Sequence, residues 1–219
     1  MYPDTRSRLV AARTALVLGP VLAGISAIFQ PDLDGTPRHQ LAAIGDSPLA
    51  AVSAVTFLVA QLPLLVAVLA IGRLLQERAP RLSSWGTALG VLGCFGHTVF
   101  GGISMVYLTM ARDGTHHGVY ADLMTRLQNS PVMLFSAVGL LGTVLGLLLL
   151  GIGLFRTRTG PVWVGPAIWA FLVVEFVGTA VSTYASYLSV LVLTAAFFAL
   201  AGVLDRTGSR ETLPDGQLV

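Results

Sequence analysis

The sequence predicts an all-α protein, a polytopic transmembrane bundle of six helices that forms a single domain over residues 1–219. Of the 219 residues, 54% are hydrophobic and only 11% are charged, whereas soluble domains carry about 25% charged residues. The mean hydropathy is +0.78, and apolar stretches long enough to cross a bilayer recur along the chain. This composition excludes a soluble globular domain, a disordered chain and a protein that binds nucleic acid.

Six segments each hold about 20 mainly apolar residues, the length that a helix needs to cross the hydrocarbon core. They are expected at 9–29, 48–74, 84–111, 131–155, 162–181 and 184–204. The second and fourth open with Ser47-Pro48 and Ser130-Pro131, in which a capping serine precedes a proline at the first helical position. Only two residues separate the last two spans. They are nevertheless distinct, because one helix over 162–204 would be about twice the bilayer thickness.

Arginine sets the expected orientation, since the chain contains 13 arginines and no lysine. With six spans, ten of the 13 fall on one side of the membrane, and only Arg38, Arg112 and Arg126 fall on the other. Positively charged loops stay in the cytoplasm, so we expect a multi-pass protein of the inner (plasma) membrane with both termini cytoplasmic. Residues 205–219 would then form a flexible cytoplasmic tail. The alternative, that the first span is a cleaved signal peptide, would break this distribution of arginines.

The two longer loops, about 30–47 and 112–130, would lie outside, and each carries the signature of a short helix. Thr36-Pro37 is a capping residue followed by a proline start, and Gly45 is a stop signal. The segment 117–129 repeats apolar residues at helical spacing. We expect interfacial helices that cap the outer end of the bundle, either sealing it or covering a site.

The second and fourth spans begin alike, and the helices that follow them open at Trp85 and Trp163. Twelve residues after these tryptophans lie His97 and Glu175, respectively. We interpret spans two-three and four-five as a weak internal repeat of a helical hairpin. The repeat predicts that His97 and Glu175 lie at the same depth on equivalent helices.

Glu175 is the only carboxylate inside a predicted span. An ionisable residue is costly in hydrocarbon, so its default interpretation is functional. We expect Glu175 to be protonated near neutral pH and to pair with His97, because pairing lowers the desolvation cost of both groups. These two residues are the candidate catalytic pair. The alternative is a hydrogen-bonded pair that only fixes the helix register.

Polar and aromatic residues continue along the same spans, and they would line a cleft for an apolar ligand or for a carbocation held by ring faces. The candidate substrate-binding residues are Gln61, Phe100, Ser104, Tyr107, Trp169, Phe171, Phe176, Thr179, Ser182 and Tyr184. For the aromatic residues the alternative is ordinary packing.

No cofactor or metal is expected. A transmembrane haem needs two axial histidines at matched depth, and only His97 lies in a span. The adjacent His116 and His117 in a loop are a weak metal signal. The spacings Gly86-xxx-Gly90 and Gly142-xxx-Gly146 predict close helix approach within the monomer.

The all-arginine composition, rich in Ala, Leu, Val and Gly, is similar to that of chains from GC-rich actinobacteria. In size and helix count the chain resembles the small integral-membrane terpene cyclases of meroterpenoid and indole-terpenoid pathways. The resemblance covers the architecture and rests on no sequence motif. It implies an isomerase or lyase of terpenoid biosynthesis that cyclises a prenylated substrate, with Glu175 as proton donor and aromatic side chains that steady the cation.

Three classes of function remain open. The first is a membrane enzyme on a lipid-like small-molecule substrate, with Glu175 as general acid and His97 as the residue that tunes it. The second is a proton-coupled carrier or exporter of a small apolar solute, in which the same pair relays protons and two copies of the chain assemble. The third is a structural membrane subunit in which the pair is architectural. All three have membrane lipid as a partner.

Overall fold

In the computed structural model, the described residues are 5–113, 115–182 and 184–211, and they are helical throughout apart from short connections. Within these described residues, five helices are long and apolar enough to cross a bilayer. They are α1 (Thr5–Ile28), α3 (Ala50–Leu75), α4 (Pro80–Arg112), α6 (Met133–Thr157) and α8 (Tyr184–Glu211). Helix α8 therefore includes 205–211, part of the expected tail, and residues 212–219 lie outside the described residues.

The fifth expected span, 162–181, is wrong in length. Helix α7 (Val164–Phe176) has 13 residues and covers about 20 Å at 1.5 Å per residue, short of the ~30 Å hydrocarbon core. After it comes a single 3₁₀ turn, η1 (Gly178–Ala180). Glycine and β-branched residues crowd the segment 177–183, and both lower helix propensity, which is why the helix stops before it crosses.

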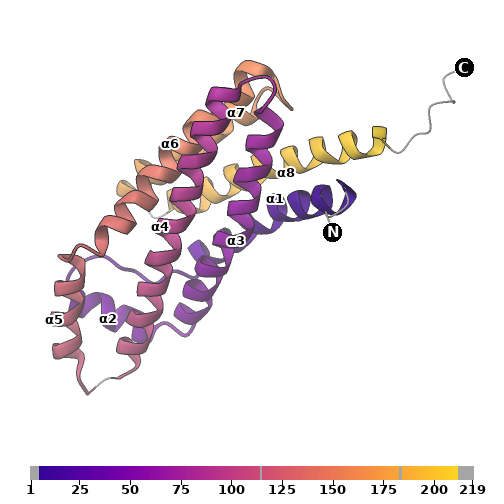
Figure 1. Ribbon diagram of the computed structural model, residues 1–219. Coiled ribbons are helices and arrows are strands. Elements are labelled where there is room, and N and C mark those ends of the chain that lie inside the picture. The colour runs from indigo at the N-terminus through magenta and orange to yellow at the C-terminus, as the bar shows by residue number, and fades with distance from the viewer. Residues whose placement is uncertain (1–4, 114, 183, 212–219) are drawn as a thin grey trace, which may run out of the picture.

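Successive helices run antiparallel. Ser26 of α1 lies beside Ser53 of α3, and the Ser83 hydroxyl near the start of α4 donates to the Gly72 carbonyl near the end of α3. Further along the chain, α7 runs back along α6, and α8 returns along α7. The start of α1, the α3–α4 turn, the α6–α7 turn and the end of α8 therefore share one end of the bundle, while α2 and α5 lie at the other (Figure 1).

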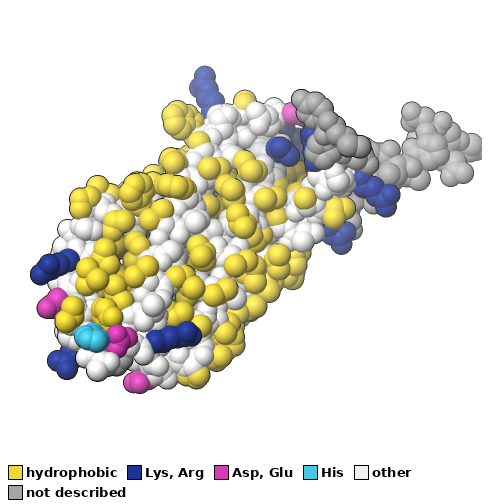
Figure 2. Space-filling model, turned by 60° about the horizontal axis from the view of Figure 1, so that its bottom comes forward, with side chains coloured by type: hydrophobic (Ala, Val, Ile, Leu, Met, Phe, Trp, Pro, Cys, Tyr) yellow, Lys and Arg dark blue, Asp and Glu magenta, His cyan; other side chains and the backbone are white. Residues whose placement is uncertain are grey.

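We call these two ends the arginine end and the loop end. The segments that carry ten of the 13 arginines lie at the arginine end, as the sequence predicts. In Figure 2 charged side chains gather at the two ends of the visible face, and hydrophobic side chains cover much of the surface between them. This distribution is what a multi-pass membrane protein requires, because the middle of the bundle meets hydrocarbon.

Both expected loop helices are present, as α2 (Pro37–Asp46) and α5 (His117–Gln128). Thr36 caps α2, since its hydroxyl oxygen accepts a hydrogen bond from a backbone N–H of the first turn. Leu41 of α2 and Met124 of α5 are buried in a small apolar cluster with the last turns of α4. The two helices thus form a packed cap on the loop end.

Helices α4 and α6 pack through a seam of glycines. The missing Cβ of Gly146 would lie 2.5 Å from the Gly90 nitrogen, and that of Gly142 would lie 2.6 Å from the Gly93 nitrogen. Only glycine fits where two helix backbones approach this closely. The predicted role of the Gly86-xxx-Gly90 and Gly142-xxx-Gly146 spacings, close approach within one chain, is confirmed.

The expected repeat is not confirmed. The hairpin of α3 and α4 has a second helix of 33 residues, whereas the hairpin of α6 and α7 has a second helix of only 13. The aligned helices therefore differ in their lengths and in how far they reach along the bundle.

Candidate functional site

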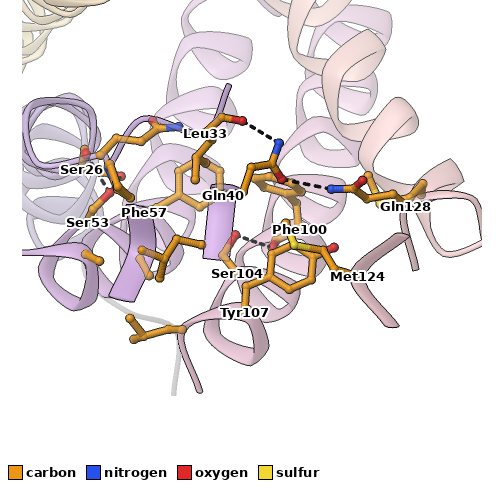
Figure 3. A pocket seen from close by; sticks show the side chains of 17 residues that line it. Ser26, Leu33, Gln40, Ser53, Phe57, Phe100, Ser104, Tyr107, Met124 and Gln128 are labelled. Carbon is orange, nitrogen blue, oxygen red and sulfur yellow. Dashed lines mark hydrogen bonds between the residues drawn. The ribbon is translucent and has the colours of Figure 1, made fainter. Parts of the chain in front are cut away.

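A cavity of about 320 Å³ lies at the loop end. It is lined by the end of α1 and the loop after it, α2, the first turns of α3, the last turns of α4, α5 and the first residue of α6 (Figure 3). The cap formed by α2 and α5 therefore covers a hollow instead of sealing a solid core. This space lies at the low end of the ~300–1,000 Å³ range typical of small-molecule sites.

The walls of the cavity are mainly apolar. Phe57 and Phe100 meet edge to face with their ring centroids 6.0 Å apart, and Met124 and Met133 contribute flexible thioethers. Aromatic and methionine side chains adapt to irregular apolar ligands. Among the described residues that line the cavity, none carries a charge.

Hydrogen bonds of two side-chain amides link α2 to α5 and to the loop before α2, next to the cavity. The Gln40 side-chain amide of α2 donates to the Leu33 carbonyl over 2.6 Å, and its oxygen accepts from the Gln128 amide of α5 over 3.3 Å. On the opposite wall the Ser53 hydroxyl donates to the Ser26 carbonyl over 2.9 Å. These polar groups are largely satisfied within the protein, so they shape the cavity without leaving strong unused donors.

Tyr107 is the exception. Its side chain lines the cavity and is 7% exposed, and its hydroxyl has no hydrogen-bond partner among the described residues. A buried hydroxyl left unpaired costs about 1–3 kcal/mol, so among the residues that line the cavity Tyr107 has the most to gain from a further hydrogen-bond partner. One turn before Tyr107, Ser104 donates to the Phe100 carbonyl over 3.1 Å and keeps its oxygen free to accept.

The start of α5 is fastened by Asp113, which follows the last residue of α4. The Asp113 carboxylate accepts hydrogen bonds from the Thr115 hydroxyl (2.8 Å), a His116 ring nitrogen (3.0 Å) and the Tyr120 hydroxyl (3.0 Å). These hydrogen bonds hold the pKa of Asp113 well below its usual range, the Thr115 contact contributing most. The hydrogen bond from the Tyr120 hydroxyl to the Asp113 carboxylate raises the pKa of Tyr120, because the carboxylate stabilises the protonated hydroxyl. An ionised Asp113 therefore anchors one end of the cap.

The structure does not bring the candidate catalytic pair together. The Glu175 carboxyl on α7 contacts the Ser189 hydroxyl on α8, while the His97 ring on α4 meets Phe57 of α3 edge to face, with centroids 5.8 Å apart. Among the described residues no hydrogen bond or ion pair links Glu175 to His97. The reason is that α7 turns its Glu175 face toward α8, whereas His97 faces α3.

Three of the ten candidate substrate-binding residues, Phe100, Ser104 and Tyr107, line the loop-end cavity. Gln61 does not line it. This residue is buried, and its side-chain amide donates a hydrogen bond to the Phe57 carbonyl one turn earlier (3.0 Å). The three cavity residues share one face of α4, because positions 100, 104 and 107 follow one another at intervals of about one turn.

The other six candidates lie away from this cavity, on α7, in the α7–α8 turn and at the start of α8. They are Trp169, Phe171, Phe176, Thr179, Ser182 and Tyr184. Trp169 packs on α6, where its ring lies 5.6 Å from that of Phe155, and Phe171 is part of the main apolar core. The remaining four are exposed. The two predicted stripes therefore do not form one cleft.

Sequence reasoning missed several residues that shape the cavity, notably Phe57, Gln40 and Gln128. Phe57 is one of many apolar residues in an apolar span, and nothing in the sequence distinguishes it. The two glutamines lie 88 positions apart in different loop helices. Their meeting follows from the fold alone.

Comparison of the chain with protein-family models, with curated proteins and with solved structures finds no match. The resemblance to membrane terpene cyclases therefore rests on size and helix content only.

Proposed function

We propose that the protein binds a small, uncharged, mainly apolar molecule in the loop-end cavity of a multi-pass membrane bundle. The observation that supports this most directly is the buried, unpartnered hydroxyl of Tyr107 beside an otherwise apolar space of about 320 Å³. A cavity without charged lining selects against ions, because burying an unpaired charge is costly. The single free hydroxyl would give the ligand one fixed point of attachment.

The lining defines the chemistry of this ligand. The rings of Phe57 and Phe100 and two methionines suit an apolar body. The Tyr107 hydroxyl can donate to a carbonyl or alcohol oxygen, and it can also accept. A lipid-like alcohol, ketone or quinone, prenylated compounds included, has both parts. Such molecules dissolve in the bilayer and can enter the bundle from the side.

The test is to purify the protein, extract bound small molecules into organic solvent and quantify them by mass spectrometry. Ala54→Leu fills the cavity, whereas the matched control Val55→Leu changes a neighbour that is 45% exposed. We expect the compound that copurifies with the wild type to be lost from the Ala54 variant and kept by the control. The same occupancy in both variants would refute the site.

A second variant, Tyr107→Phe, keeps the ring and removes only the hydroxyl. Losing one hydrogen bond of about 1.4 kcal/mol would weaken binding about tenfold. We expect this in a titration of the extracted compound. An unchanged affinity would mean that the hydroxyl is not the point of attachment.

An enzyme on a prenylated substrate is the second candidate. The observation that favours it is a carboxyl, Glu175, on an apolar helix, where the cyclase resemblance requires a proton donor. A general acid must come within hydrogen-bond reach of the atom that it protonates. Glu175 does not line the cavity, so we favour a binding protein over an enzyme. The discriminating variant is Glu175→Gln, which would abolish turnover by an enzyme and leave ligand extraction unchanged in a binding protein.

A carrier would use the same cavity for its solute. Flux that depends on a pH gradient across proteoliposomes would support that alternative.

We further propose that the arginine end faces the cytoplasm, in the inner (plasma) membrane, because positively charged loops are retained there. The chain has a single cysteine, Cys94, which is buried, so a Cys94→Ala background is suited to accessibility labelling. A membrane-impermeant maleimide added to intact cells should label Asp122→Cys at the loop end and spare Arg78→Cys at the arginine end. The reverse pattern would invert the orientation.

A further inference from the structure

The loop-end cavity offers a ligand few free hydrogens, because the side chains that line it donate theirs within the protein. Ser104 donates its one hydroxyl hydrogen to the Phe100 carbonyl over 3.1 Å. Gln40 donates its amide hydrogens to the carbonyls of Leu33 (2.6 Å) and Gly35 (3.4 Å). A hydroxyl carries one hydrogen and an amide carries two, so neither side chain has a further hydrogen for a bound molecule.

The serine pair on the opposite wall is used up in the same way. The Ser53 hydroxyl donates to the Ser26 carbonyl over 2.9 Å, and the two hydroxyl oxygens lie 3.4 Å apart. Because Ser53 has no second hydrogen, Ser26 is the donor between the two hydroxyls. Gln30 and Gln128 also line the cavity, but both side chains are exposed, so solvent can pair with their amides. Among the described residues of the lining, Tyr107 is thus the one with a buried side-chain hydrogen that no acceptor meets.

Acceptor atoms, in contrast, remain free in the wall formed by α4. A hydroxyl oxygen has two lone pairs. The Ser104 oxygen is a donor to the preceding turn and receives no hydrogen bond from another described residue, and the Tyr107 oxygen has no partner. The thioethers of Met124 and Met133 add weak acceptors. The buried part of the cavity therefore has more acceptors than donors.

Ser104 and Tyr107 are close enough in the fold to meet one polar group of a ligand. They lie three positions apart on α4, which makes them neighbours on one face of the helix, and both line the cavity (Figure 3). Long side chains of a helix lean toward the turn that precedes them. The Tyr107 ring is therefore directed back along the side of α4 that carries Ser104.

The apolar part of the lining sets the direction of the ligand. Phe100 lies seven residues before Tyr107, which is about 10 Å along α4 toward the middle of the bundle. The Phe57 ring meets Phe100 edge to face there. A molecule whose polar group is held at Tyr107 therefore places its apolar body against these two rings.

We propose that the cavity selects a lipid-like alcohol, and that Ser104 distinguishes this alcohol from a ketone, quinone or ester of the same shape. The ligand hydroxyl accepts a hydrogen bond from Tyr107 and donates its own hydrogen to the Ser104 oxygen. A carbonyl can accept from Tyr107 but has no hydrogen for Ser104. This selectivity rests on the proposed function and narrows its ligand from any apolar molecule with one oxygen to one with a hydroxyl.

Menthol and menthone are matched probes, because they share one uncharged carbon skeleton and differ only in a hydroxyl or a carbonyl at the same carbon. Equilibrium dialysis of the full-length protein in lipid nanodiscs measures the Kd of each probe. Empty nanodiscs correct for partitioning into lipid. We expect menthol to bind about tenfold more tightly than menthone, the effect of one additional hydrogen bond.

Three variants separate the two hydrogen bonds. Ser104→Ala removes the acceptor, so it should weaken menthol about tenfold and leave menthone unchanged. Tyr107→Phe should weaken both probes, because its hydroxyl donates to either oxygen. The matched control is Thr109→Ala, which removes an exposed hydroxyl that donates to the preceding turn of α4 over 3.1 Å and does not line the cavity. This control should keep the preference for menthol.

Equal affinity of the two probes for the wild type, or a preference that survives Ser104→Ala, overturns the selection of an alcohol and leaves the proposed function standing. Binding of neither probe contradicts the proposed function itself, and the selectivity with it.

The compound that copurifies with the wild type gives a second measurement that needs no variant. In deuterated methanol a hydroxyl exchanges its hydrogen for deuterium, so an alcohol gains mass, whereas a quinone or an ester does not. We expect the extracted compound to gain mass. An extracted compound of unchanged mass would occupy the cavity without a hydroxyl and would refute the role of Ser104.

Discussion

Gly96 offers the sharpest test of the helix packing on which the whole bundle depends. It lies in α4 where that helix passes closest to α6, and a Cβ built there would come within 2.3 Å of the Phe135 carbonyl oxygen and 2.4 Å of the Gly139 Cα. These neighbours are backbone atoms, which cannot rotate out of the way. Gly96→Ala must therefore push the two helices apart.

The size of the displacement sets the expected effect. Ordinary contact begins at 3.4 Å, so the helices must separate by about 1 Å at this point, and the close contacts at Gly93 and Gly90 open with them. Overpacking of this kind costs about 1–3 kcal/mol. We expect a loss of about 3 kcal/mol, near the upper limit, because no side chain can rearrange to absorb the strain. That corresponds to about a hundredfold in the folding equilibrium.

Reversible unfolding in mixed micelles, with increasing SDS and detection by circular dichroism, measures this loss. The matched control is Gly102→Ala on the same helix, where a Cβ meets no atom within 4 Å. In that control the free energy of unfolding should stay unchanged or rise by up to about 1 kcal/mol, because alanine has a higher helix propensity than glycine. Equal stability of the two variants would refute the close approach of α4 and α6.

Three further predictions concern hydrogen bonds and backbone strain. Because the pKa of Asp113 is lowered, its carboxylate stabilises the start of α5 at any pH above the usual carboxyl pKa range, and this stabilisation is lost as the pH falls below that range. Hydrogen exchange over 117–128 should therefore accelerate in acid for the wild type, and already at neutral pH for Asp113→Ala. Unchanged exchange in that variant would count against the role of Asp113. Ser83→Ala removes a 2.7 Å hydrogen bond from a side chain that is 1% exposed and should cost about 1–2 kcal/mol in the SDS assay, whereas its exposed neighbour Ser84→Ala should cost nothing measurable. Arg158, which ends α6 with φ 52°, should stabilise the protein by about 1 kcal/mol when changed to glycine, because glycine adopts this left-handed conformation freely; a loss of stability would show that the arginine side chain is needed there.

Helix positions were largely predictable from the sequence because one strong signal, hydrophobicity over a fixed length, determines them. The expected spans at 9–29 and 48–74 agree with α1 and α3 to within a few residues. The Thr36 cap and the proline after it located the start of α2. The glycine spacings on α4 and α6 also predicted where these two helices touch, because apolar helix backbones approach this closely only where the residues at the interface are small.

The candidate site was harder to predict because it depends on which helix faces are neighbours. Apolar spans look alike on every face, so periodicity cannot tell whether His97 faces α3, α6 or α7. Phe100, Ser104 and Tyr107 were predicted as polar or aromatic residues of an apolar span, and the fold places all three in the cavity wall. The rest of the lining comes from the loop helices, where Gln40 meets Gln128 only after the cap has folded.

The short α7 explains why the internal alignment led to the wrong partner for Glu175. Matching Trp163 with Trp85 assumes that two helices of equal length leave the arginine end in equivalent surroundings. Helix α7 instead ends at Phe176, and after the short turn η1 the chain continues as α8. The Ser189 hydroxyl of α8 contacts Glu175, where the alignment predicted the ring of His97. A serine hydroxyl can donate a hydrogen bond to a carboxyl, but unlike an imidazole it does not change its charge near neutral pH. Because Glu175 contacts Ser189 and His97 contacts Phe57, the two titratable groups of the expected proton relay do not pair in this fold.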